Sequence, residues 1–405
     1  VDGYSAMASP PRPRLDGHAF VKDAFERGAV AALVRQTPEG MSPDDPRLLH
    51  AADTLVGLEA LAAAARNRTR AKVVAVTGSV GKTGVKEMLR RALGALGPCH
   101  ASEGNLNNHW GAPLSLARLP VDDAYAVFEL GMNHAGEIRP LAKLVRPDVA
   151  LVTRIAPAHT AFFKNIEDIA DAKAEIFEGL DADGAAIVNA DDPMTARLAA
   201  RAEALGVRRI LRFGAAANAD IRLIDVNLQE TGSDIVADVR GQRLAYRLGA
   251  PGAHWAQNSL AVLAALYALD CDLGPAAAAL ALMRPPAGRG QRRHVAAPNG
   301  GFDLIDESYN ASPAAVRAAF AGLALARPVA NGRRVVVLGD MLELGERADA
   351  DHADLATAFV EAKLDRAHAA GPKCRRFMDA LPVAARGRWA EDAAALAAHA
   401  DEIAE

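Results

Sequence analysis

The segment from Lys72 to Leu96 constrains the fold of this chain more than any other. It opens with the apolar run Lys72-Val73-Val74-Ala75-Val76, passes through Thr77-Gly78-Ser79-Val80-Gly81-Lys82-Thr83, and continues with apolar residues at helical spacing. A buried strand that enters a helix through a glycine loop points backbone N–H groups and the helix N-terminus at an anion. The segment therefore predicts a phosphate-binding loop in a nucleotide-binding α/β domain.

Each polar residue type in this loop has a chemical reason. Gly78 and Gly81 let the backbone fold closely around phosphate, Lys82 places a cation against the β- and γ-phosphates, and the Thr83 hydroxyl is suited to ligate Mg²⁺. The strict pattern has glycine at position 76, where this chain has valine. The alternative is a plain glycine turn between strand and helix. We expect ATP and Mg²⁺ to bind here.

The size and charge of the chain limit the remaining possibilities. With 405 residues, of which 51% are hydrophobic and 24% charged, the chain is long enough for two or three globular domains. The net charge of −4 gives no general electrostatic attraction for a polyanion, and the basic residues form no long run. Nucleic acid is therefore not an expected partner.

The cysteines and the apolar segments bear on location. Cys99, Cys271 and Cys374 are far apart and form no CxxC pair, so neither a disulfide framework nor a zinc ribbon is expected. No run approaches the roughly 18 apolar residues of a membrane span, and residues 1–15 lack the apolar core of a signal peptide. We expect a cytoplasmic protein and a monomer, with residues 1–15 a loop or an incomplete beginning.

Periodicity along the chain predicts the fold class. Expected strands at 29–34, 72–76, 124–128, 149–152 and 185–188 alternate with helical patterns, including 51–67 and 166–179. This alternation indicates an α/β fold whose central, mostly parallel sheet has helices on both faces. After an expected helix at 257–269, Arg284-Pro285-Pro286-Ala287-Gly288-Arg289-Gly290 interrupts regular structure, and strands follow at 302–306 and 335–338. Domain boundaries are expected near 71 and 287.

Three further polar residues are expected near the carboxyl edge of this sheet. Glu129 ends the apolar strand and is a candidate magnesium ligand, while His159 follows the strand at 149–152 and Lys173 lies on the next helix. Asp148 precedes a strand and is interpreted as structural. The residue types alone leave a second interpretation open, in which all three candidates are ordinary surface side chains.

Several separated motifs together resemble the Mur ligases. They are the loop at 77–83, Gly104-Asn105-Leu106-Asn107-Asn108, Glu129-Leu130-Gly131-Met132-Asn133-His134, Asp306-Glu307-Ser308-Tyr309-Asn310-Ala311 and Gly339-Asp340-Met341-Leu342-Glu343-Leu344-Gly345. The likeness runs from Asp16 to about Leu381. The Thr-Gly-Ser sequence in the loop resembles that of the Mur ligase branch that joins D-alanyl-D-alanine to UDP-N-acetylmuramoyl-tripeptide.

The resemblance implies a domain plan and a reaction. A UDP-substrate-binding domain would occupy residues 1–70, an ATPase domain 71–287 and a Rossmann-like domain 288–405. The tripeptide carboxylate would attack the γ-phosphate of ATP, and the amine of D-alanyl-D-alanine would then displace phosphate from the acyl phosphate. Two Mg²⁺ ions are implied, the first held by Thr83 and Glu129 and the second by His159 and an Nζ-carbamate of Lys173. Lys82, Lys173 and His159 are the implied catalytic residues.

The same resemblance assigns nucleotide and substrate contacts. His254 and Asn258 match a stretch whose final asparagine contacts adenine, although Trp255 stands where asparagine is usual; the alternative is a polar cap on the following helix. The resemblance also implies that Arg289 and Glu307 contact the ribose and phosphates. It implies that Tyr309 and Asn310 lie in the junction loop, where Asn310 would support the phosphates; an ordinary turn-forming asparagine is the alternative. Residues expected to line the substrate cleft are Asn107, Asn108, Asn133 and His134.

Two departures and two alternative functions accompany the resemblance. The Asp-Ser-Arg stretch expected before Asp16 is not recognisable, and the closing Lys-Gly-Ser segment is missing, so the C-terminal domain is expected to be incomplete. Another acyl-phosphate ligase, such as a sister Mur enzyme or folylpolyglutamate synthetase, would share the loop, the metals and the lysine. A noncatalytic nucleotide switch is the alternative from a different class, although no guanine-reading Asn-Lys-x-Asp is present.

Overall fold

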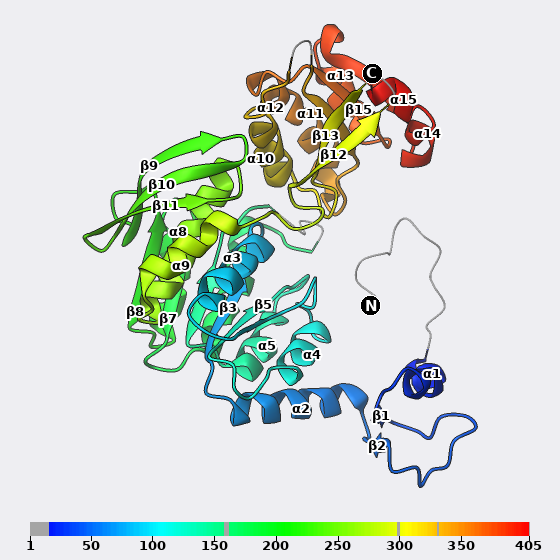
Figure 1. The fold of residues 1–405 in the computed structure, drawn as a ribbon, viewed down its shortest axis with the longest axis vertical. Helices are drawn as coiled ribbons and strands as arrows, with labels where there is room; N and C mark the ends of the chain where they lie inside the picture. The colour runs from blue at the N-terminus through cyan, green and yellow to red at the C-terminus, as the bar shows by residue number, and fades with distance from the viewer. Residues whose placement is uncertain (1–15, 158–161, 298–299, 330–331, 405) are drawn as a thin grey trace.

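A computed structural model describes residues 16–157, 162–297, 300–329 and 332–404. His159 and the segment 1–15, on which two of the expectations above fall, lie outside the described residues. Figure 1 shows a large central domain that carries a small N-terminal unit at one end and a C-terminal domain at the other. No helix among the described residues has the length and hydropathy that a membrane crossing requires.

The N-terminal unit is small and built around a minimal core. It contains η1 (Gly17–Phe20), α1 (Val21–Glu26) and the parallel strands β1 (Ala32–Val34) and β2 (Leu48–His50). Val21, Val34 and Leu48 form its buried cluster. The helix expected at 51–67 is α2 (Thr54–Arg68), which begins at Thr54 because the Asp53 carboxylate accepts hydrogen bonds from the N–H groups of Leu55 and Val56.

The central domain is organised by a nine-stranded sheet in the order β11-β10-β9-β8-β7-β6-β3-β5-β4. The strands are β3 (Lys72–Thr77), β4 (Cys99–Ala101), β5 (Tyr125–Glu129), β6 (Val149–Val152), β7 (Ala185–Asn189), β8 (Arg209–Gly214), β9 (Ile221–Gln229), β10 (Gly232–Val239) and β11 (Gln242–Leu248). Within this order, the strands β9-β8-β7-β6-β3-β5-β4 pair with one another in parallel, which confirms the predicted, mostly parallel sheet. The chain crosses from one side of β3 to the other between β5 and β6. The loop after β3 therefore lies at the topological switch point, where α/β proteins bind ligands.

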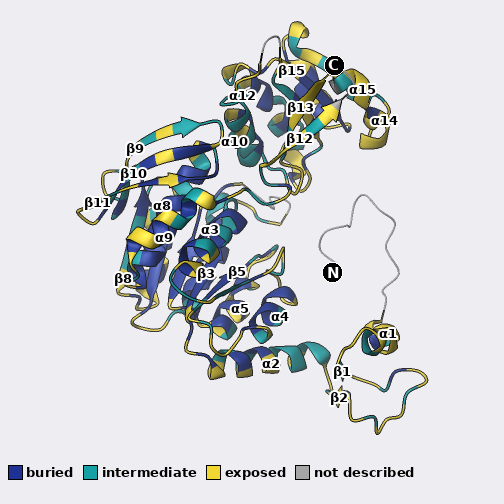
Figure 2. Cartoon of the chain, viewed as in Figure 1, coloured by how far each residue is buried: buried dark blue, intermediate teal, exposed yellow. Residues whose placement is uncertain are grey.

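Helices cover both faces of this sheet, as the sequence predicts. Val74 and Val76 of β3 pack with one set of helices, and Val73 and Ala75 pack with the other. Figure 2 shows the resulting buried strands in dark blue. The first set is α3 (Lys82–Gly94), α8 (Ala253–Ala268), α9 (Leu273–Ala279) and η3 (Leu280–Leu282), and the second includes α4 (Gly111–Ala117), α5 (Ile138–Val145), α6 (Ile166–Ala174), η2 (Glu175–Gly179) and α7 (Thr195–Ala204).

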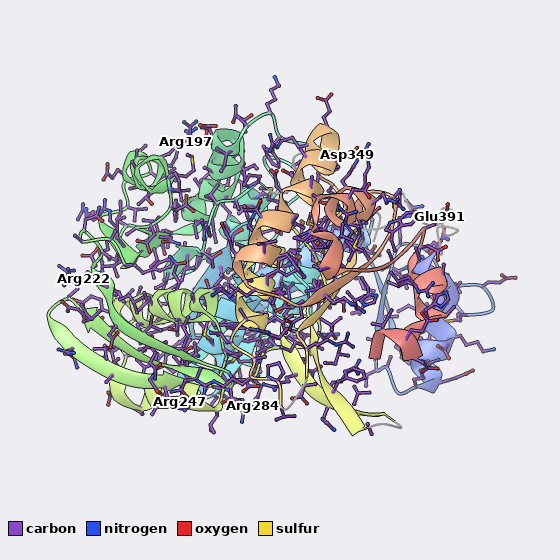
Figure 3. All side chains as sticks on the ribbon, turned by 90° about the horizontal axis from the view of Figure 1, so that it is seen from above. Arg197, Arg222, Arg247, Arg284, Asp349 and Glu391 are labelled. Carbon is purple, nitrogen blue, oxygen red and sulfur yellow. The ribbon has the colours of Figure 1, made fainter. Side chains whose placement is uncertain are left out.

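The antiparallel meander β9-β10-β11 is a difference from the expected sheet. Its strands alternate polar and apolar residues and lie at the sheet edge, so they lack the continuous apolar runs by which the other strands are recognised. Figure 3 shows Arg222 and Arg247 of these strands, together with Arg197 and Arg284, projecting at separate places around the outside of the central domain.

The C-terminal domain follows the hairpin β12 (Gln291–Ala297) and β13 (Gly300–Asp306). Its parallel sheet contains β14 (Val335–Gly339), β15 (Arg366–Ala370) and β16 (Arg386–Ala390). The strands expected at 302–306 and 335–338 correspond to β13 and β14. The remaining elements are α10 (Pro313–Leu323), η4 (Gly345–Arg347), α11 (Ala348–Ala353), α12 (Leu355–Glu361), α13 (Cys374–Ala380), η5 (Val383–Ala385), α14 (Ala393–Ala397) and α15 (Ala400–Ala404).

Candidate functional site

The glycine loop has the backbone geometry that its sequence predicts. Gly78 has φ +150° and Gly81 has φ +87°, conformations that side-chain-bearing residues rarely adopt. A Cβ at position 78 would lie 1.9 Å from Oγ1 of Thr153, and this hydroxyl donates to the Val80 carbonyl at 2.6 Å. Ser79 donates its N–H to the Arg154 carbonyl at 2.7 Å. The loop is therefore held tightly against the segment that follows β6.

Lys82 is the first residue of α3 and folds back over its own loop. Its Nζ donates to the Gly78 carbonyl at 2.8 Å. Burial lowers the pKa of Lys82, the Glu129 carboxylate acts in the opposite direction, and the Arg289 guanidinium lowers the pKa further. Arg289 therefore lies near enough to Lys82 for the two cations to repel each other, and a bound polyanion such as a polyphosphate would relieve that repulsion.

Thr83 and Glu129 are paired below the loop. The Thr83 hydroxyl donates to Oε2 of Glu129 at 2.8 Å, and Asn107 donates to Oε1 of the same carboxylate at 2.8 Å. The Glu129 side chain is 2% exposed. The structure therefore brings together two predicted metal ligands and one predicted substrate residue, with hard oxygen atoms of the type that Mg²⁺ prefers.

Lys173 is buried on α6, with 1% of its surface exposed. Burial lowers the pKa of Lys173 well below its usual value, and repulsion from Lys82 lowers it further. The interpretation of Lys173 as a surface lysine is therefore wrong. The predicted contribution of His159 stays a prediction, because His159 lies outside the described residues.

Helix α8 lies against the loop and brings Asn258 to it. A Cβ added at Gly81 would lie 3.0 Å from both polar atoms of the Asn258 amide. The helix begins at Ala253 instead of the expected residue 257, so Asn258 lies in the second turn. The alternative in which Asn258 caps the helix is therefore wrong. His254 is near the start of α8, and burial lowers its pKa to about 4.

Trp255 packs against the phosphate-loop helix. The residue is 4% exposed, and a Cβ added at Gly84 would lie 2.9 Å from its ring. Trp255 therefore fills the space between α3 and α8. The tryptophan that stands where similar sequences have asparagine therefore has a packing role in this chain.

Gly84→Ala is expected to destabilise the protein by about 1–3 kcal/mol, because the added Cβ would lie 2.9 Å from the buried Trp255 ring and would force that ring or the helix to shift. Gly94→Ala at the end of the same helix is the matched control, since nothing lies within 4 Å of its added Cβ. The control is expected to gain up to about 1 kcal/mol from helix propensity. Thermal unfolding measures both. Equal midpoints for the two variants would contradict the packing role of Trp255.

Arg289, Glu307 and Tyr309 meet where the central domain passes into the C-terminal domain. The Arg289 guanidinium lies 4.3 Å above the Tyr309 ring, and Tyr309 donates its N–H to the Gly288 carbonyl at 3.1 Å. Asn310 is exposed in the loop after β13. Glu307 is exposed as a residue, yet its Oε1 lies so near Gly290 that a Cβ there would approach it to 3.2 Å. Partial removal from water raises the pKa of Glu307 to about 7, against the effect of Arg289.

This raised pKa predicts a pH-dependent difference from Glu307→Gln. The folded state holds the Glu307 proton to about pH 7, whereas an ordinary glutamate carboxyl has a pKa of 4.5. The protonated Glu307 side chain contributes to the free energy of unfolding. This contribution is complete below pH 4.5 and is lost as the pH rises to about 7. Wild-type thermal midpoints should therefore fall relative to those of the variant across this window. Parallel midpoints for both proteins would contradict the prediction.

The other predicted substrate residues have mixed placements. Asn108 accepts hydrogen bonds from the N–H groups of Trp110 and Gly111, so its side-chain oxygen binds backbone where α4 begins. Asn133 and His134 lie in the loop after Glu129, where their N–H groups donate to Glu137. The exposed His134 ring lies 4.7 Å from that of Phe162. Among the four, Asn107 is the residue whose side chain contacts Glu129.

Two buried carboxylates that support the site were not predicted. Asp192 accepts the N–H of Ile155 at 2.6 Å, and Glu175 accepts the N–H groups of Gly136 and Arg139. Asp192 thus binds the backbone that follows β6, and Glu175 binds the backbone at the start of α5. Asp192 follows β7 at the same carboxyl edge as Glu129, and this placement is the sequence signal that could have identified it.

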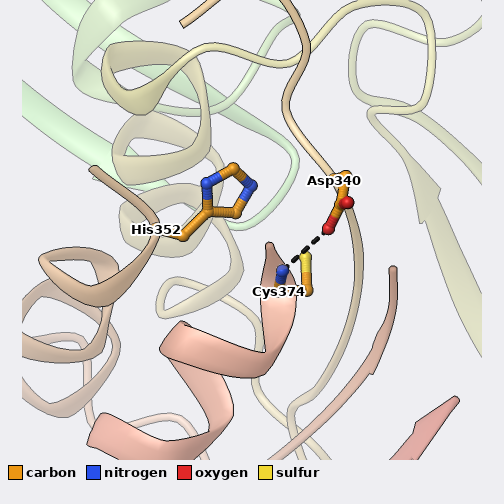
Figure 4. A group of neighbouring side chains, drawn as sticks. All are labelled: Asp340, His352 and Cys374. Atoms are coloured by element: carbon orange, nitrogen blue, oxygen red, sulfur yellow. Dashed lines mark hydrogen bonds between the residues drawn. The ribbon is translucent and has the colours of Figure 1, made fainter. Parts of the chain in front are cut away.

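Asp340, His352 and Cys374 bring potential metal-binding atoms within 4.8 Å of one another (Figure 4). Each donor is already engaged. His352 accepts the Met341 N–H at Nε2 and donates from Nδ1 to the Ala348 carbonyl, while Asp340 accepts the Cys374 N–H at 2.7 Å. Burial raises the pKa of the Cys374 thiol. The cluster therefore joins α13 to the end of β14 and does not fit a metal ion.

A groove of about 600 Å³ lies between α10 and α12. It is lined by Arg317, Asp354, Glu361 and small residues, none of which belongs to the phosphate loop. None of the residues that line this groove is among the predicted site residues.

Comparisons with known proteins identify the family of the chain. Residues 76–266 match the Mur ligase middle domain, and residues 288–405 match the Mur ligase, glutamate ligase domain. The UDP-N-acetylmuramoyl-tripeptide–D-alanyl-D-alanine ligase of Escherichia coli K12 is 36% identical over 371 residues, which cover 91% of this chain and 79% of that protein.

Solved structures agree as well. A crystal structure of MurF from Acinetobacter baumannii has a TM-score of 0.83 and 32% identity, covering 97% of this chain and 83% of that one. MurF ligase from Thermotoga maritima in complex with ADP has a TM-score of 0.78 and 25% identity, covering 97% and 87%. The chain thus belongs to the Mur ligases, in the family of UDP-N-acetylmuramoyl-tripeptide–D-alanyl-D-alanine ligases.

Proposed function

We propose that this chain is an ATP-dependent ligase that joins D-alanyl-D-alanine to UDP-N-acetylmuramoyl-tripeptide during peptidoglycan precursor synthesis. The observation that carries the proposal is the buried Thr83–Glu129 pair beneath a phosphate loop, together with the buried Lys173 near Lys82. The E. coli relative bears the name of this activity, and the T. maritima neighbour was solved with ADP. An ATP-consuming reaction of this kind belongs in the cytoplasm.

Thr83 and Glu129 fit a first Mg²⁺ ion, because both offer hard oxygen atoms in a buried pair. When bound, Mg²⁺ offsets the negative charge of the phosphates and of the attacking carboxylate. Lys82 would exchange its hydrogen bond to Gly78 for one to phosphate, so it binds the charge that the reaction moves. Glu129 is held in place by Thr83 and Asn107 before any ligand arrives.

Lys173 would contribute to a second Mg²⁺ site as an Nζ-carbamate. A lysine with a lowered pKa keeps its Nζ lone pair available. That lone pair attacks the carbon of CO₂, and an N–H proton leaves to a base, which converts an amine into a carboxylate-like ligand. His159 is the proposed companion ligand. A buried anion at this position would be favoured by nearby cations, including Lys82.

The remaining residues are assigned to the nucleotide and the peptide ends. Asn258 lies against the loop and would contact adenine, while Arg289, Glu307 and Asn310 would contact the ribose and phosphates from the domain junction. Asn133 and His134 would line the cleft beyond Asn107. The domains at 1–70, 71–287 and 288–405 would hold the UDP substrate, bind ATP and close over the nucleotide, respectively. Closure would keep water from the acyl phosphate.

The proposal is tested by phosphate release from ATP with Mg²⁺ and bicarbonate. Release should require both UDP-N-acetylmuramoyl-tripeptide and D-alanyl-D-alanine. Turnover with another amine in place of D-alanyl-D-alanine would instead identify a sister ligase or a folylpolyglutamate synthetase. ATP binding without turnover on any amine would identify a nucleotide switch.

A further inference from the structure

A second lysine of the phosphate-loop helix is buried without a place in the proposed chemistry. Lys86 is 1% exposed, and its Nζ donates to the Ser102 carbonyl at 2.6 Å. The same Nζ lies 2.9 Å from Oε1 of Glu87, a partly buried neighbour on the helix. A lysine is seldom buried this completely unless its ammonium is bound, so the contact with Ser102 calls for an explanation.

Ser102 lies where β4 ends beside β5. Its N–H donates to the Val127 carbonyl at 3.0 Å, which extends the parallel pairing by one residue. Its Oγ then accepts the backbone N–H of Glu129 at 3.3 Å. A side chain thus replaces the next strand residue as the partner of Glu129, and Ser102 itself is 2% exposed. The backbone position of Glu129 therefore depends on where Ser102 is held.

Helix α3 reaches Glu129 by two routes. Thr83 donates directly to the Glu129 carboxylate, and Lys86, one turn later on the same helix face, reaches the Glu129 backbone through Ser102. The two routes fix the side chain and the main chain of one residue against the helix that begins at the phosphate loop. All four residues are buried.

We propose that Lys86 is a positioning residue for the magnesium site, in that it holds Ser102 so that Glu129 meets Thr83 at the distance a shared metal ion requires. The inference rests on the proposed function of Thr83 and Glu129 as metal ligands. Supporting residues of this kind commonly change metal affinity by about 10- to 100-fold. A lysine suits the task because its long stem spans the packed interior while its ammonium binds a carbonyl.

The competing explanation is that Lys86 only stabilises α3 through Glu87. Glu87→Gln tests this, because it removes the ion-pair partner and leaves the bond to Ser102. Lys86→Met keeps the length of the side chain and removes the ammonium. Ser102→Ala removes the Oγ that accepts from Glu129 and leaves the carbonyl that binds Lys86.

The experiment measures Mn²⁺ binding in the presence of ADP, by electron paramagnetic resonance on the full chain. Lys86→Met and Ser102→Ala are each expected to weaken Mn²⁺ binding by about tenfold or more, while Glu87→Gln leaves it unchanged. Because the two residues act in series, the double variant should resemble the single variants instead of multiplying their effects. Lys86→Arg, which keeps a cation, should restore part of the affinity. ADP binding without metal serves as the check that each variant is folded.

The outcomes separate the inference from the proposal beneath it. Wild-type protein that bound no Mn²⁺ with ADP would overturn the metal site itself. Wild-type binding with unchanged affinity in Lys86→Met would overturn the positioning role alone. Weakened binding in Glu87→Gln equal to that in Lys86→Met would assign Lys86 to helix stability and also overturn it.

Discussion

Lys173→Ala is expected to abolish ligation while ATP binding largely survives. The phosphate loop is held by hydrogen bonds that do not involve Lys173. Lys82 donates to the Gly78 carbonyl within the loop, and Ser79 and Val80 bind the segment after β6. The proposed carbamate supplies one anchor for a metal ion that stabilises the transition state by several kcal/mol, so its loss should cost about a thousandfold in rate. Phosphate release and calorimetric titration with ADP measure the two properties separately.

The design includes two controls. Lys173→Met fills the buried space with a side chain of similar length, so equal losses in both variants would exclude a simple packing defect. Lys143→Ala removes an exposed lysine on α5 that pairs with Glu178 at 3.3 Å, and it should leave turnover unchanged. Carbon-13 NMR after incubation with labelled bicarbonate should show a carbamate signal in wild type and none in Lys173→Ala. If Lys173→Ala kept a tenth of wild-type turnover, the proposed metal-binding role of Lys173 would be refuted.

Glu129→Gln is expected to raise the Mg²⁺ concentration needed for half-maximal activity by about 100-fold or more, because supporting residues alone commonly cost about 10- to 100-fold. Glutamine keeps the shape of the side chain but carries no charge and directs an amide toward Thr83 or Asn107, both of which donate to Glu129. Activity as a function of Mg²⁺ measures the shift.

The exposed Glu103 provides the matched control. Its carboxylate pairs with Arg118 at 3.4 Å and has 79% of its side-chain surface exposed, so Glu103→Gln should leave the Mg²⁺ dependence unchanged. Asn107→Ala should give a smaller shift than Glu129→Gln, because it removes a partner of the ligand and not the ligand. An unchanged Mg²⁺ dependence in Glu129→Gln would remove this carboxylate from the metal site.

Sequence reasoning was most successful where the relevant residues are adjacent in the chain. The strand β3, the loop and the start of α3 are contiguous, and glycine at 78 and 81 specifies backbone angles that few other residues adopt. Periodicity likewise predicts β1, β3, β5, β6, β7, β13 and β14, but it does not identify β4, β8, β15 and β16. It fails for β9, β10 and β11, whose alternating pattern at a sheet edge carries a weaker signal.

The strand–loop–helix order, the phosphate loop and the α/β class are determined by the amino-acid sequence alone, because local steric preferences and apolar periodicity act over a few residues. Tertiary structure decided that Thr83 and Asn107 both donate to the Glu129 carboxylate. It also decided that Trp255 fills the space beside Gly84 and that Lys86 binds the Ser102 carbonyl. These contacts join residues that lie on different strands and helices. Their geometry follows from the order of strands in the sheet and from close packing, and neither property is local to any one segment.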